Sequence, residues 1–129
     1  TSGLSSREIV PFALVDNGLR WHVRGFDRAK NRFADFVINR IEEPKILETE
    51  IPEDQKKSHD NQWNRIVDLE IVPHPRLKHP KTIELEYGMQ KGALTTQVRA
   101  ALVGYVLRHW CVDCSTNHEL DGPEIHLWL

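Results

Sequence analysis

The chain has 129 residues and a mass of 15.0 kDa, which suits one medium domain or two very small ones. With 40% hydrophobic residues, 28% charged residues and a net charge of -2, its composition excludes a disordered or fibrous chain. A pI near 6.4 excludes blanket electrostatic binding to duplex nucleic acid, which needs many cations on one face. Residues 1–40 nevertheless hold seven Lys or Arg against four acidic residues, so a local anion site remains open.

Three features of the sequence bear on the cellular setting. The sequence has no run of about 18 apolar residues and no signal-peptide pattern, so we expect a soluble, cytoplasmic chain with no membrane partner. The two cysteines are too few for a disulfide-stapled secreted fold. The chain begins at Thr1 without Met, and its opening "TSGLSS" is typical of a loop, so we expect a fragment of a larger protein.

The first third of the chain predicts a short β-meander. Apolar residues nearly alternate over residues 8–15 and 19–26, and "DNG" at 16–18 between them is a strong hairpin signal, because Asn-Gly tolerates positive φ. A third strand is predicted over residues 32–41, after the polar loop "DRAKN". These strands favour a small barrel or sheet.

The remaining sequence predicts a linker and then an α+β unit. Residues 42–63 are acidic, hold two prolines and lack a clear period, with a short helical turn expected near Ile46 and Leu47. The stretch "PHPRLKHP" indicates a solvated connection, with a basic partner-binding loop as the alternative. The expected elements are a strand at 65–72, a helix from Pro80 to near Gly88, a β segment at 93–98, a helix at 97–110 and a final strand at 124–129.

The strand "WHVRGFD" places a cation and an imidazole side by side. Residues two apart in a strand face the same side, so if Trp21 and Val23 are in the core, His22 and Arg24 stand together outside it. Such converging groups, with Arg7 and Arg40 in reach, would suit a phosphate or carboxylate. The alternative is an ordinary solvated face on which nearby aspartates, Asp27 or Asp35, pair with the arginines.

A cysteine and histidine cluster near the C-terminus is the one feature that invites metal or redox chemistry. The spacing H-x-C-x2-C-x3-H joins His109, Cys111, Cys114 and His118, but structural zinc sites usually draw ligands from two separated segments, so free thiols are expected. The sequence contains no nucleophile with its base, no glycine-rich phosphate loop and no paired catalytic carboxylates. We therefore expect no enzyme activity, no cofactor and no metal.

The stretch "SREIVPFALVDNGLRWHVRGFDRAKNRFADFVINRI" resembles the WYL domain of bacterial transcription regulators. Arg7 and Pro11 match its first element, Trp21-His22-Val23 stands at the tripeptide that names the family, and Phe36 through Arg40-Ile41 matches its last strand. Downstream, "IELEYGM" and "VRAALVGYVLRHW" are similar to the C-terminal extension that follows WYL domains in regulators of phage-defence loci.

This resemblance implies a fold class that is mainly β plus α+β. Residues 1–48 would form a ligand-sensing Sm-like or SH3-like small β-barrel whose first strand is expected before Thr1. Residues 49–64 would be a linker, and residues 65–129 a ferredoxin-like α+β extension that forms a homodimer. Operator DNA would be bound by a winged helix-turn-helix that is absent from this sequence.

The resemblance also implies a polar pocket for nucleic acid, a nucleotide or another anionic effector. The implied ligand-binding residues are Arg7, His22, Arg24 and Arg40, with Ser6 and Phe36 as weaker candidates. Ala34 and Val37 stand where the family often has basic residues, so the pocket would carry less positive charge. The alternative is a protein-interaction module with a hydrophobic groove lined by Phe36, Trp63 and Trp128.

Overall fold

A computed structural model describes residues 5–120 and 122–129, and the chain divides into two compact units. The first unit ends at Asn61, and the second unit is Gln62–Leu129. The first unit holds a three-stranded sheet and the second a four-stranded sheet with short helices. The predicted mixture of β and α+β structure is confirmed at this coarse level, whereas the Sm-like barrel and the ferredoxin-like arrangement stay predictions.

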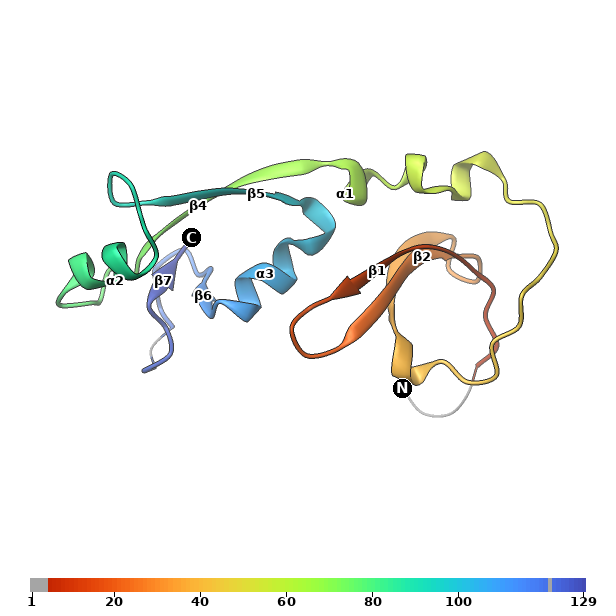
Figure 1. The fold of residues 1–129 in the computed structure, drawn as a ribbon, viewed down its shortest axis with the longest axis horizontal. Coiled ribbons are helices and arrows are strands. Elements are labelled where there is room, and N and C mark those ends of the chain that lie inside the picture. The colour runs from red at the N-terminus through yellow and green to blue at the C-terminus, as the bar shows by residue number, and fades with distance from the viewer. Residues whose placement is uncertain (1–4, 121) are drawn as a thin grey trace. The chain divides into compact units, whose positions relative to one another are not determined.

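The sheet of the first unit is an antiparallel meander in the order β1-β2-β3 (Figure 1). Its strands are β1 (Ile9–Asp16), β2 (Trp21–Asp27) and β3 (Arg32–Val37). The predicted hairpin is confirmed: Asn17 Oδ1 accepts the Leu19 and Arg20 N–H groups at 2.9 and 2.8 Å, and Gly18 has φ of 92°. The third strand is shorter than predicted, because Ile38–Arg40 forms a 3₁₀ turn, η1.

One face of this sheet is buried, and Phe26 lies on that face. Phe26 pairs across the strands with Val10 and Phe33, and the Phe26 and Phe33 rings meet edge to face with centroids 5.1 Å apart. Val10, Val15 and Phe26 are all buried. Strands β1 and β2 approach closely at Gly25, where a Cβ would meet the Val10 carbonyl oxygen and lie 2.8 Å from the Cα of Pro11. Only glycine fits there.

The segment that follows the sheet leaves it in a wide arc and returns toward β2, as Figure 1 shows. It contains η2 (Glu53–Gln55), η3 (Lys57–His59) and the single turn α1 (Asn61–Asn64). The helical turn expected near Ile46 and Leu47 is wrong, since both residues lie outside any helix and their side chains are 96% and 51% exposed. Helical geometry instead begins at Glu53.

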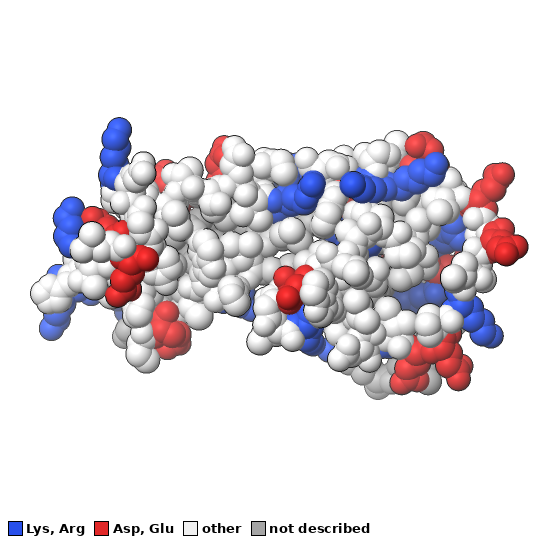
Figure 2. Space-filling model, in the orientation of Figure 1, with Lys and Arg blue, Asp and Glu red and all other residues white. Residues whose placement is uncertain are grey.

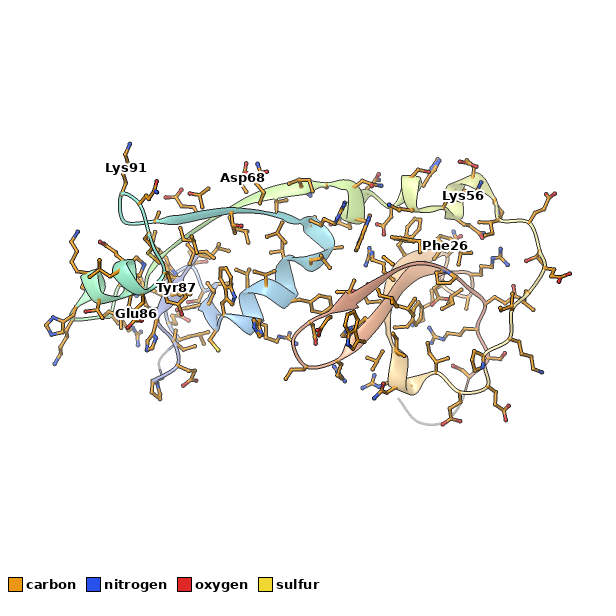
Figure 3. The ribbon with its side chains drawn as sticks, in the orientation of Figure 1. Phe26, Lys56, Asp68, Glu86, Tyr87 and Lys91 are labelled. Atoms are coloured by element: carbon orange, nitrogen blue, oxygen red, sulfur yellow. The ribbon has the colours of Figure 1, made fainter. Side chains whose placement is uncertain are left out.

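The second unit has a sheet in the order β5-β4-β7-β6, in which only the β6–β7 pair is parallel. Its core is built from Leu69, Ile71, Ile83, Leu107, Val112 and Leu127. Asp68 stands on the side of β4 away from α3 (Figure 3) and accepts a hydrogen bond from Gln97. The elements are β4 (Ile66–Pro73), α2 (Pro80–Glu86), β5 (Leu94–Arg99), η4 (Ala100–Leu102), α3 (Val103–His109), β6 (Val112–Asp113) and β7 (Leu127–Trp128).

The helix predicted over residues 97–110 is wrong in its first half. Val98 pairs with Val67 in the β4–β5 ladder, and the Ala100 N–H donates to the Arg65 carbonyl at 2.8 Å. A short 3₁₀ turn follows, so α3 begins only at Val103. Local helical spacing therefore yields to strand pairing. The predicted helix at Pro80 is confirmed, and none of the helices in the described ranges could span a membrane.

Candidate functional site

Arg24 is a buried cation near the centre of the first unit. Its Nε and Nη2 donate to the two carboxylate oxygens of Asp60 at 2.7 and 3.1 Å, and its Nη1 donates to Asp35 Oδ1 at 3.1 Å. Arg24 is 7% exposed and Asp60 1% exposed. Asp35 is its neighbour across the β2–β3 ladder, whereas Asp60 comes from the returning segment 36 residues later. Two distant parts of the chain thus meet at one guanidinium.

The guanidinium is held in its charged state by these contacts. Burial lowers the pKa of Arg24, but the hydrogen bonds from Arg24 to Asp60 and Asp35 outweigh it, so the pKa of Arg24 lies above its ordinary value. The two-point pairing with Asp60 uses the planar fork that guanidinium groups present to carboxylates and phosphates. One guanidinium thus lies between two carboxylates.

The predicted outward orientation of His22 and Arg24 is wrong. His22 is 4% exposed, whereas Trp21, which was expected in the core, is 53% exposed. His22, Arg24 and Phe26 are two residues apart along β2 and so face the same side of the sheet, where Phe26 packs inward against Phe33. Of the two aspartates named in the solvated alternative, Asp35 pairs with the buried Arg24, whereas Asp27 pairs with Arg7.

The structure brings some of the predicted ligand-binding residues together and separates others. His22 and Arg24 share the buried face, while Phe36 pairs with Val23 and Ala34 pairs with Gly25, which places Phe36 and Ala34 on the opposite face. An arginine at position 34 would therefore not have joined the buried row. Whether these residues contact a ligand stays a prediction.

The remaining predicted residues lie toward the surface. Arg7 Nη1 donates to Asp27 Oδ2 at 2.9 Å, and the Arg7 side chain is 37% exposed while that of Asp27 is 1% exposed. Ser6 is exposed ahead of β1, and Arg40 is exposed in η1. Of the predicted cations, Arg7 and Arg40 are thus the two that a solute can reach without rearrangement.

A second arginine, Arg28, holds the same returning segment. Its guanidinium donates to Gln55 Oε1 at 2.9 Å, to Thr49 Oγ1 at 3.3 Å and to the Glu50 carbonyl at 3.4 Å. We call residues 49–60 the strap, because Arg28 holds its first part and Arg24 its last residue. Sequence reasoning treated residues 49–64 as a linker and so missed Asp60. The available signal was that Arg24 lies two residues from Phe26 on the same strand and so faces the same side. A buried arginine needs a carboxylate partner, which had to come from elsewhere in the chain.

The first unit also carries a shallow apolar depression lined by Pro11, Phe12, Ala13, Leu14 and Val23. Leu14 is 66% exposed there. The groove expected from three aromatic residues is not assembled within one unit, because Phe36 belongs to the first unit whereas Trp63 and Trp128 belong to the second. Trp63 packs on the Arg99 guanidinium, and Trp128 Nε1 donates to the Ser115 carbonyl at 2.9 Å.

The second unit contains its own buried polar pair, His74 and Asp113. The His74 Nε2 lies 2.9 Å from Asp113 Oδ2, and the two residues are 3% and 0% exposed. His74 Nδ1 accepts the Arg76 N–H at 3.2 Å, which assigns the ring proton to Nε2 and makes Nε2 the donor to Asp113. The expected solvated loop at "PHPRLKHP" is therefore wrong at His74.

Asp113 collects four contacts that join the C-terminal segments. Its carboxylate accepts the Ser115 N–H at 2.8 Å and the Leu120 N–H at 3.1 Å in addition to His74, and its backbone carbonyl accepts the Leu129 N–H at 3.0 Å. Burial raises the pKa of Asp113, but the hydrogen bonds from Ser115, His74 and Leu120 outweigh it and hold that pKa well below its ordinary range.

The cysteine and histidine cluster is dispersed around this pair. The His118 ring contacts His74 and Trp128 edge to face, with centroid distances of 6.0 and 5.5 Å. Cys111 is half-buried with φ of 52° just after α3, and Cys114 is an exposed thiol whose pKa is raised by its partial burial and by the Asp113 charge. Among the residues that the structure describes, no three such side chains are placed to hold a metal ion.

Asp60→Ala should unfold the first unit more easily, because it leaves the buried Arg24 with one fewer carboxylate. We expect a loss of about 3 kcal/mol in the free energy of unfolding, measured by urea denaturation. Glu53→Ala is the matched control, since this strap carboxylate is exposed and pairs only at the surface with Lys56. Equal effects of the two substitutions would contradict a structural role for Asp60.

Asp113→Asn should flatten the acid limb of stability. Because the folded-state pKa of Asp113 lies below its ordinary value of 3.8, its contribution is complete above pH 3.8 and is lost as the pH falls through the lower folded-state pKa. The urea midpoint of the unaltered chain should fall more steeply below pH 3.8 than that of the variant. Parallel midpoint curves in this window would show that the carboxylate contributes nothing.

Two known families match successive segments of the sequence, as two units follow one another in the structure. Residues 1–46 match the WYL domain, and residues 66–129 match the C-terminal dimerization domain of the BrxR transcriptional regulator. The match to the dimerization domain begins at the first residue of β4.

Curated relatives align with most of the chain. The DNA-binding transcriptional repressor CapW of Escherichia coli strain KTE188 is 30% identical over 122 residues, covering 93% of this chain and 39% of the repressor. CapW of Stenotrophomonas maltophilia is 36% identical over 101 residues, covering 77% and 33%, and CapW of Pseudomonas aeruginosa is 35% identical over 104 residues, covering 78% and 33%. The chain thus spans between a third and two fifths of the relatives that it matches.

The chain therefore consists of a WYL domain followed by a BrxR-type C-terminal dimerization domain, and it is homologous to the CapW repressors.

Proposed function

We propose that this chain is the effector-sensing and dimerization region of a DNA-binding transcriptional repressor. The observation that carries the proposal is the tandem of a WYL domain and a dimerization domain in a chain of which 93% aligns with a DNA-binding transcriptional repressor. The curated relatives are named as repressors, which supports a regulator without enzyme activity, acting in the cytoplasm.

Operator DNA would be bound by a winged helix-turn-helix outside this sequence. Figure 2 shows Lys and Arg side chains as well as Asp and Glu side chains on the face that it draws. The net charge of -2 gives the chain no general excess of cations, whereas a duplex-binding surface concentrates cations along one face.

The second unit would join two copies of the chain through apolar positions on its surface.

 In the second unit, Leu85 is 83% exposed, Trp110 is 37% exposed and Leu129 is 42% exposed. Exposed apolar side chains of this kind are buried when copies associate. A homodimer formed by this unit is the state that we propose for the intact regulator.

The first unit would sense an anionic effector, either an oligonucleotide or a nucleotide, on a small Sm-like barrel of which its three strands are a part. Of the residues that the family resemblance implies, Arg7 and Arg40 are exposed cations, whereas Arg24 is buried. Binding would change the affinity of the intact protein for operator DNA only if the effector prefers one of two states of the dimer.

A protein-interaction module is the second candidate function, and the apolar depression along β1 and β2 favours it. This depression is lined by five residues of β1 and β2, among which Leu14 is 66% exposed. A module of this kind would bind a peptide or a protein partner without any dependence on Arg40.

The dimer can be tested by sedimentation equilibrium on the whole chain. We expect a mass near twice 15.0 kDa that dissociates on dilution. Leu85→Glu places a charge at a highly exposed apolar position of the second unit and should weaken association if that position is in the interface, whereas Leu19→Glu, in the hairpin of the first unit, should not. A mass of 15.0 kDa at all concentrations would contradict the proposed homodimer.

The effector proposal can be tested by fluorescence anisotropy with a short single-stranded oligonucleotide and with a nucleotide. Arg40→Gln should weaken binding about tenfold through the loss of one charge-assisted hydrogen bond. Arg108→Gln is the matched control, because this exposed arginine lies in α3 of the second unit. Binding that is unchanged in Arg40→Gln would place the site elsewhere, and the absence of any binding would favour the protein-interaction module.

A further inference from the structure

We infer that the Asp60 carboxylate is an internal stand-in for an oxyanion at Arg24, which an anionic ligand displaces when it binds. This inference rests on the proposed effector-sensing function of the first unit and names a subsite for it. The ligand group would be a carboxylate or a phosphate, because each presents two oxygens to the guanidinium fork.

The geometry of the Arg24–Asp60 pair is that of a bound ligand. Both Asp60 oxygens are engaged, one by Nε at 2.7 Å and the other by Nη2 at 3.1 Å. Asp35 binds Nη1 from the neighbouring strand and would remain in place. An incoming oxyanion could therefore take the Nε and Nη2 edge of the guanidinium without disturbing the sheet.

Charge requires that Asp60 leave when such a ligand enters. Arg24 already lies between two carboxylates, so a third negative group would face two like charges in a desolvated place. Replacing Asp60 by the ligand keeps one cation between two anions. The exchange therefore substitutes one two-point pair for another and preserves the local charge.

The strap is attached in a way that permits this exchange. Neither η2 nor η3 buries a residue, and Lys56 between them points away from the sheet (Figure 3). Asp60 is the one buried residue of the strap, and Arg24 and Arg28 bind the strap through polar contacts. Little apolar surface needs to be exposed when Asp60 is released.

Release of Asp60 would loosen the chain at the boundary between the two units. Asp60 is followed by Asn61, the last residue of the first unit, and α1 begins there. On the other side of the boundary, the Trp63 carbonyl accepts Arg99 Nη1 at 2.8 Å, and the Trp63 ring packs on the same guanidinium at 4.7 Å. The short connection is thus fixed to β2 at one end and to β5 at the other, and displacement of Asp60 frees its first end.

The test compares oxyanion binding to the whole chain with that of Asp60→Asn, using a short single-stranded oligonucleotide in one arm and inorganic phosphate in the other. Asp60→Asn keeps the size and one acceptor oxygen but removes the competing charge, so the probe should bind about tenfold more tightly. Glu53→Gln is the matched control, because it removes an exposed strap carboxylate that pairs with Lys56, and it should leave affinity unchanged. Binding of phosphate identifies a free anion subsite, and binding of the oligonucleotide alone identifies a phosphodiester subsite; either supports the inference if Asp60→Asn strengthens it.

Amide hydrogen exchange on the unaltered chain provides a readout that does not depend on the folding of a variant. Saturating probe should speed exchange in residues 61–64 several-fold and leave the β4–β5 ladder unchanged. Equal affinity of all three chains, or unchanged exchange in residues 61–64, would overturn the stand-in role while leaving effector sensing intact. Failure of every probe to bind any of the chains would instead overturn the proposed sensing function, and this inference with it.

Discussion

The first unit depends on the burial of one charge. Arg24 sits on the inward face of β2, where a guanidinium is tolerated only if carboxylates accompany it. Asp35 is supplied by the neighbouring strand, but Asp60 must be brought from the far end of the unit. This requirement holds the last residue of the strap against β2.

The second unit applies the same constraint with a different pair. His74 leaves β4, Asp113 lies in β6, and the hydrogen bonds of Asp113 reach Ser115, Leu120 and the final residue. A short parallel contact between β6 and β7 would provide little hold by itself, since it joins two residues from each strand. The buried carboxylate compensates by gathering the backbone donors of an otherwise irregular C-terminal segment.

The Arg24–Asp60 pair sets the buried cation of β2 apart from the exposed cations of the first unit. The sequence resemblance to WYL domains implied that Arg24 would be a contact for an anionic ligand. Here its fork is occupied by the chain itself, and the exposed cations Arg7 and Arg40 lie outside that pair. Arg24 therefore holds the strap in the first unit, and the ligand displacement inferred above would act on this structural contact.

The amino-acid sequence by itself determined the features that depend on neighbouring residues: the Asn17-Gly18 hairpin, the start of α2 at Pro80, and the WYL and dimerization motifs. Only the tertiary structure decided which face of β2 is buried, that Asp60 reaches Arg24, and that Val98 joins a strand. Alternation cannot tell the two faces of a strand apart when each carries aromatic residues, as Trp21 and Phe26 do. The partner of a buried charge lies wherever the fold returns the chain, and pairing with β4 outweighs local helical spacing at residues 97–99.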